Sequence, residues 1–73
     1  MYIVIELQKT AEGTLGNFVW AFQSKSEAES KYHSVLAAAA ISSIPVHAAT
    51  LLSEQGYVIA SQCYLHDAEA LDA

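Results

Sequence analysis

The sequence predicts an α+β domain of two layers, a four-stranded, mainly antiparallel sheet with one helix packed on one face. The expected order along the chain is strand, strand, helix, strand, strand. Alternating β-branched and aromatic residues predict two strands before the middle of the chain and two after it. A long alanine-rich segment between these pairs has helical periodicity. Short glycine-containing segments join the strands of each pair, which favours two hairpins.

The first hairpin is expected from residues 2–8 and 17–23, with a loop between them that contains two glycines. The first strand alternates between two faces, which carry Ile3, Ile5 and Leu7 against Val4, Glu6 and Gln8. The second strand places aromatic side chains opposite smaller ones, Phe18, Trp20 and Phe22 against Val19 and Ala21. Because side chains alternate across a strand, each strand offers apolar groups on both faces.

The helix is expected to begin near Lys25 or Glu27, because Ser24 and Ser26 each precede a glutamate by three residues. One helical face should pack on the sheet, and it comprises Ala28, Tyr32, Val35, Leu36 and Ala39. Glu27, Ser30, Lys31 and Ser34 are expected to face solvent. The last turns are apolar on every side until Ser42, Ser43 and Pro45 end the helix.

The second hairpin is expected from residues 46–53 and 57–66, with Gly56 in a left-handed position of the turn. Residues 1–66 would form a single domain. Residues 67–73 are small and acidic, which predicts a flexible C-terminal tail.

Size and composition favour association of several copies. A chain of 73 residues, 53% of them hydrophobic, has little interior in which to bury them, and a single cysteine allows no disulfide within the chain. One helix covers only one face of a sheet, and the other face is not clearly polar. We therefore expect a homodimer or a larger homo-oligomer. The predicted interface residues are Ala37, Ala38, Ala40, Ile41, Phe18, Trp20 and Phe22.

Charge excludes several classes of partner. The chain has three lysines, no arginine and eight acidic residues, for a formal net charge of −5. Three scattered lysines cannot form the basic surface that binds nucleic acid directly, nor a basic helix that lies on a membrane. No apolar run is long enough to span a bilayer, and residues 1–8 lack the basic segment of a signal peptide. A cytoplasmic protein is expected.

No motif predicts a catalytic residue, a metal site or a cofactor. The three histidines lie far apart in sequence, and successive residues such as Lys31, Tyr32 and His33 point in different directions from a helix. We interpret His47 and His66 as a structural cross-strand pair and Cys63 as a small buried hydrophobic group. Weaker candidates for contacting a ligand are Trp20, Tyr32, His33, His47 and Tyr64.

The pattern YIVIELQ…GNFVWAF…EAESKYHSVLAAAA…PVHA…GYVIASQCYLH resembles a group of small uncharacterised proteins encoded by bacteriophages and prophages of gut bacteria. The similarity covers nearly the whole chain. These proteins have no established activity or catalytic residues, so the resemblance implies only a genomic setting and the cytoplasm of an infected or lysogenic bacterial cell.

Three functional hypotheses follow. The first is a non-enzymatic, homo-oligomeric binding protein that antagonises a host defence factor, either by occluding a protein or by sequestering a small ligand. The second is a structural or assembly component of the phage particle. The third, and the least supported, is a small enzyme whose site lies between subunits and uses His33, His47, His66, Cys63 and the tyrosines.

Overall fold

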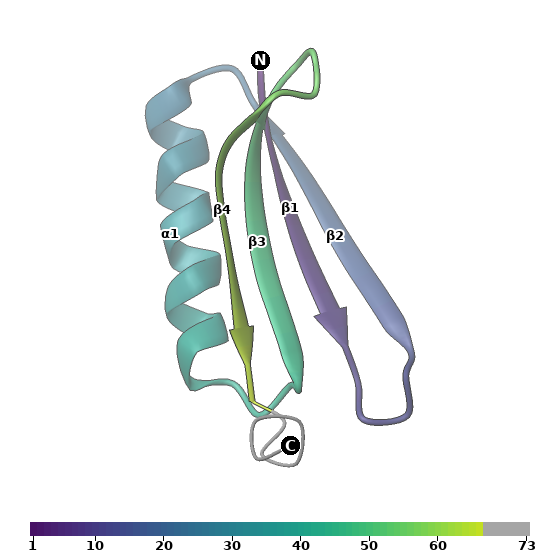
Figure 1. Cartoon of the computed structure of the whole chain (residues 1–73). Coiled ribbons are helices and arrows are strands. Elements are labelled where there is room, and N and C mark those ends of the chain that lie inside the picture. Colours follow the sequence, from purple (N-terminus) through teal and green to yellow (C-terminus); the bar gives the residue numbers. More distant parts are fainter. Residues whose placement is uncertain (67–73) are drawn as a thin grey trace.

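The computed structural model describes residues 1–66, and the predicted tail of residues 67–73 lies outside them. Strands β1 (Tyr2–Lys9) and β2 (Leu15–Phe22) precede helix α1 (Lys25–Ile41), and strands β3 (Val46–Ser53) and β4 (Val58–Leu65) follow it. Figure 1 shows the helix lying along one side of a single sheet. The predicted α+β arrangement and its element order are therefore confirmed.

The strands lie in the order β2-β1-β3-β4, and all neighbours are antiparallel. Both predicted hairpins are present, and the pairing of β1 with β3 joins them at the centre of the sheet. The chain reaches β3 from β2 through α1, which passes over the sheet (Figure 1). The first and last strands of the sheet order, β2 and β4, are therefore its edges.

Local chemistry explains the element boundaries. Ser24 caps the helix, because its side chain accepts a hydrogen bond of 3.3 Å from the backbone N–H of Glu27. Strand β2 begins at Leu15 rather than at the expected Asn17, because Leu15 pairs with Lys9 and extends the ladder to the loop. In the second turn Gly56 has a φ of 91°, the left-handed conformation that was predicted for it.

The core lies between the helix and one face of the sheet. All five helix residues that were expected to pack on the sheet are buried, and four of them, Ala28, Tyr32, Val35 and Leu36, form one core cluster with strand residues of that face. The strand members of this core are Val4, Ala49 and Leu51. Tyr32 supplies the largest side chain on the helix and is 6% exposed. Lys31 was expected in solvent but is half-buried, because it extends over the ring of Trp20.

Candidate functional site

The face of the sheet that points away from α1 is apolar and uncovered within residues 1–66. Its residues follow from strand alternation and from the pairing register. In each strand they are the positions next in sequence to those that face the helix, and across the strands they pair with one another. This surface, called the open face below, comprises Ile3, Ile5, Leu7, Lys9, Leu15, Asn17, Val19, Ala21, Val46, Ala48, Thr50, Leu52, Val58, Ser61, Cys63 and Leu65.

The open face carries almost no charge. Lys9 at its border is the one charged residue among those assigned to it, although the whole chain has a formal net charge of −5. Several of its apolar side chains are largely in solvent, for example Val19 at 62% and Leu65 at 51% exposure. An apolar surface of this extent is typical of an interaction site, because isolated soluble domains rarely expose one.

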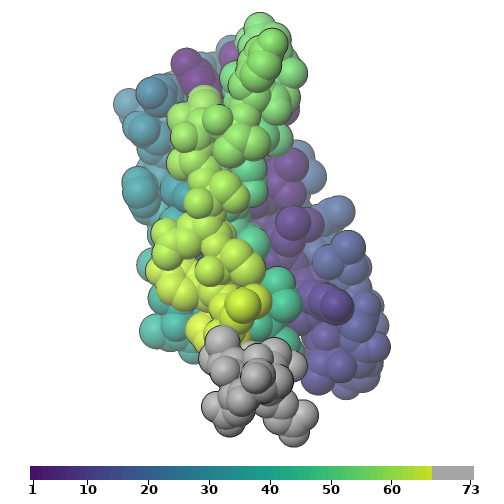
Figure 2. Space-filling model, viewed as in Figure 1, coloured from purple at the N-terminus to yellow at the C-terminus, as the bar shows by residue number. Residues whose placement is uncertain are grey.

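The two edge strands extend this surface. Neither β2 nor β4 contains a charged residue or proline, the groups that commonly prevent sheet edges from pairing with other chains. Figure 2 shows β4 exposed along its length at the front of the molecule. The pairing of β4 with β3 is interrupted by a β-bulge between Leu51 and Leu52, which is the one register shift in the described sheet.

The structure places the predicted interface residues on two other surfaces. Ala37, Ala38, Ala40 and Ile41 are exposed on the outer side of α1, where Ile41 is 88% exposed. Phe18, Trp20 and Phe22 lie on the helix side of β2, because they pair with Glu6, Val4 and Tyr2. The open face itself could be found from strand alternation, but the sequence does not reveal which face the helix covers.

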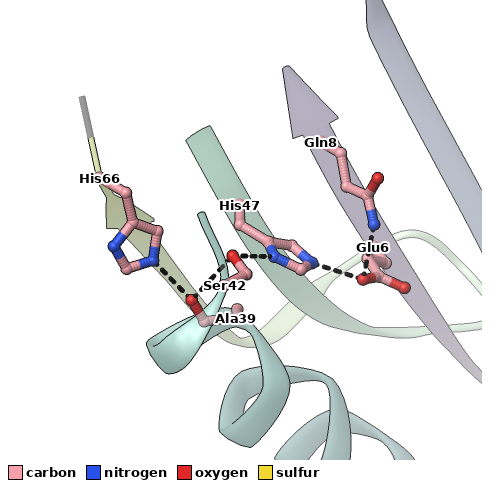
Figure 3. A network of polar contacts seen from close by, with 6 residues as sticks. All are labelled: Glu6, Gln8, Ala39, Ser42, His47 and His66. Carbon is pink, nitrogen blue, oxygen red and sulfur yellow. Dashed lines mark hydrogen bonds and ion pairs between the residues drawn. The ribbon is translucent and has the colours of Figure 1, made fainter. Parts of the chain in front are cut away.

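A polar network crosses the end of the helix beneath the sheet (Figure 3). His47, which is 3% exposed, lies between Glu6 on β1 and Ser42 after α1. Its Nε2 is 2.5 Å from Glu6 Oε2, and its Nδ1 is 2.9 Å from Ser42 Oγ. Nε2–H of His47 donates to the Glu6 carboxylate, and the one hydroxyl hydrogen of Ser42 is shared between His47 Nδ1 and the carbonyl oxygen of Ala39. Gln8 Nε2 donates to the same Glu6 oxygen at 3.1 Å.

Serine, histidine and glutamate are also the residue types of a hydrolytic triad, but this arrangement favours a structural role. Ser42 Oγ lies 3.2 Å from the carbonyl oxygen of Ala39, at the C-terminal end of the helix. Carbonyl groups point outward there, whereas a reacting serine needs N–H donors to stabilise an oxyanion. The network instead satisfies the helix end and attaches it to β1 and β3.

His66 belongs to the same helix end. Its Nε2 donates to the carbonyl oxygen of Ala39 at 2.6 Å. His47 and His66 were expected to form a cross-strand pair, but His47 pairs with Tyr64, and His66 follows the end of β4. His47 and His66 are therefore connected through Ser42 and the carbonyl oxygen of Ala39 and do not contact each other by a hydrogen bond.

The remaining ligand candidates do not converge on one site. Tyr32 is in the core, as was preferred for it, and His33 is an exposed helix residue whose ring meets Tyr32 edge-on. Tyr64 stacks on His66 with ring centroids 6.1 Å apart. Trp20 lies on β2, at the other edge of the sheet from β4.

The expectation for Cys63 was wrong. Cys63 is exposed rather than buried. The physical reason is its position, since it pairs with Ala48 on the open face of an edge strand, where no helix covers it. Alternation places its neighbour Tyr64 on the helix side instead, where that side chain packs against the core.

Within residues 1–66, no three His, Cys, Asp or Glu side chains gather into a group that could hold a metal ion. The helix of this described part is neither long nor apolar enough to cross a membrane. Comparisons with protein-family models, with curated proteins and with solved structures find no match to the chain.

Proposed function

We propose that the protein is a non-enzymatic, homo-oligomeric binding protein whose copies pair through the open face. The observation that carries the proposal is an apolar, nearly uncharged sheet face in an acidic chain. A second copy is the occupant that this surface favours. Two such faces can approach without bringing like charges together, because the acidic residues of the described strands and helix lie elsewhere.

The size of the face is sufficient for a stable pair. Four strands of eight residues cover a plane of about 500 Å² at the usual strand spacing and rise per residue. Pairing two copies over the whole plane therefore removes about 1,000 Å² from water, which is the threshold expected of a biological interface. Side-chain relief adds to this area, and sheets that pack face to face form such a layer routinely.

In the phage setting that the resemblance implies, we propose a role as an antagonist of a host defence factor. Occlusion of a protein is favoured over sequestration of a small ligand, because the ligand candidates Trp20, Tyr32, His33, His47 and Tyr64 do not form one site. A structural component of the phage particle is the alternative. The two unprotected edge strands favour that alternative, since edges of this kind allow sheets to join into larger assemblies.

The pairing is tested by placing a charge on each candidate surface. Val19→Lys adds a charge to the open face at a position already 62% exposed, so the fold should tolerate it. Ala38→Lys is the matched control on the exposed side of α1. We expect light scattering to show a dimer for the native chain and Ala38→Lys and a monomer for Val19→Lys. Dissociation by Ala38→Lys alone would assign the interface to the helix and overturn the proposal.

A further inference from the structure

A second surface lies on the opposite side of the sheet, between α1 and β2. The helix packs mainly over the central strands β3 and β1, which leaves the helix side of β2 partly uncovered. Phe18 and Trp20 stack there with ring centroids 6.1 Å apart, and Phe18 is 51% exposed. A groove of about 360 Å³ continues beside them, lined by Phe22, Glu27, Ser30, Lys31 and Ser34.

The ring of Trp20 already holds a cation. Lys31 Nζ lies 4.1 Å from the ring centroid, a distance typical of a cation–π contact. The surrounding charge favours a cation as well. Glu27 lines the groove and is exposed, whereas the Glu6 carboxylate is already bound to His47 and Gln8. The Glu27 carboxylate therefore stands against the ammonium of Lys31, in a chain with a formal net charge of −5.

The backbone beside these rings is free to bind an extended chain. Strand β2 pairs with β1 on one side only, and it contains neither charge nor proline. A segment that adds to this edge as a strand gains backbone hydrogen bonds, and its alternate side chains project over Phe18 and Trp20.

The stacked rings of Phe18 and Trp20 and the groove beside them are together called the aromatic groove. We propose that the aromatic groove binds an arginine side chain of an extended basic segment from a partner protein, and that the arginine displaces Lys31 from Trp20. Guanidinium is the preferred group, because it is planar, stacks on aromatic rings and pairs with carboxylates. Glu27 is the carboxylate that lines the groove. The groove lies on the helix side of the sheet, so this binding goes beyond the proposed pairing through the open face.

Trp20 is the single tryptophan of the chain, so its fluorescence reports directly on the groove. The probe is a short blocked peptide that alternates threonine with arginine, and the comparison peptide carries glutamate in place of arginine. We expect a saturable change in fluorescence with the arginine peptide and none with the glutamate peptide. Leu65→Lys, on the open face at the opposite edge strand β4, should disrupt the pairing but retain this binding, which separates failure of the groove from failure of the pairing.

Lys31→Ala distinguishes displacement from general attraction of opposite charges. It removes the internal competitor, so the arginine peptide should bind about two- to fivefold more tightly, the factor for an exposed cation–π contact. Lys25→Ala is the matched control, since it removes the same charge from an exposed position of the same helix. It should shift the affinity less than Lys31→Ala does.

Phe18→Ala is a second variant, at a half-exposed position where the fold should persist, as thermal unfolding will show. It should weaken binding of the arginine peptide. Absence of saturable binding, equal effects of Lys31→Ala and Lys25→Ala, or tighter binding of the glutamate peptide would each overturn the proposal.

Discussion

The two faces of the sheet are built from the same strands but differ in how far they are buried. On the covered face, Val4, Ala49 and Leu51 are fully buried under α1, and the polar His47 and Glu6 are hydrogen-bonded to each other. On the open face, residues of the same apolar types remain partly in solvent. The difference lies in the single helix, and it shows that the open face has the composition of a core without its second layer.

Adjacent leucines offer the largest test of this comparison. Leu51 is 1% exposed on the covered face, whereas Leu52 is half-buried on the open face. Leu51→Ala should lower the free energy of unfolding by about 2–5 kcal/mol, because it leaves a cavity in the core. Leu52→Ala should lower the free energy of unfolding by less, and this loss should grow with protein concentration because copies pair through the open face. Urea unfolding of both variants at two protein concentrations measures the two losses. Equal losses that do not depend on protein concentration would contradict the difference between the covered face and the open face.

The polar network tests how the covered face accommodates a buried histidine. Removing His47 leaves the Glu6 carboxylate with only one of its two side-chain hydrogen bonds, the one from Gln8. His47→Leu should therefore lower the free energy of unfolding by about 3 kcal/mol. The double variant Glu6→Leu/His47→Leu should recover part of that loss, since no unpaired carboxylate remains. A double variant whose loss equals the sum of the single losses would contradict coupling between these residues.

Ser42 should have a smaller effect, because water can reach its partly buried hydroxyl. Ser42→Ala removes the side-chain contacts with His47 and with the Ala39 carbonyl oxygen. We expect a loss of about 1 kcal/mol in the free energy of unfolding. Ser43→Ala, one residue further along and exposed, is the control and should leave stability unchanged. Chemical denaturation measures the free energy of unfolding of both variants. Equal values for Ser42→Ala and Ser43→Ala would contradict a structural role of the Ser42 hydroxyl.

The smallest effect is expected away from both faces, in the turn between β3 and β4. The Met1 amino group donates to Glu54 Oε1 at 2.7 Å, and this hydrogen bond, with its charge, lowers the pKa of Glu54 below the ordinary 4.5. A depressed carboxyl pKa contributes stability above the unfolded pKa and loses it as pH falls through the folded pKa. An NMR titration should give a low midpoint that rises with added salt. An ordinary midpoint would show that the ion pair does not form.

The sequence was sufficient for the elements and insufficient for how they are arranged. Period-two alternation, capping by Ser24 and the turn glycine Gly56 are local signals, so the strands, the helix face and the hairpins could be predicted. The strand order depends on β1 meeting β3, a pairing between distant segments that no local pattern encodes. The side on which α1 crosses the sheet from β2 to β3 then decides which face the helix covers, and so it also decides that Cys63 is exposed.

The site was predicted less completely for the same reason. Glu6, Ser42 and His47 are separated in sequence and meet only after the helix folds back over β1 and β3. Each reads as an ordinary polar residue in its own segment. The alternation of residues 2–8 shows that the strand has two faces with apolar residues on each. Only the position of the helix decides which face becomes the core and which becomes the open face.

The most direct test of pairing through the open face is the absolute mass of the native chain in solution, measured by light scattering over a range of concentrations. We predict twice the 7.9 kDa chain mass, with dissociation only on dilution. A mass of 7.9 kDa at every concentration would contradict the account, because the open face would then remain in water in the isolated protein.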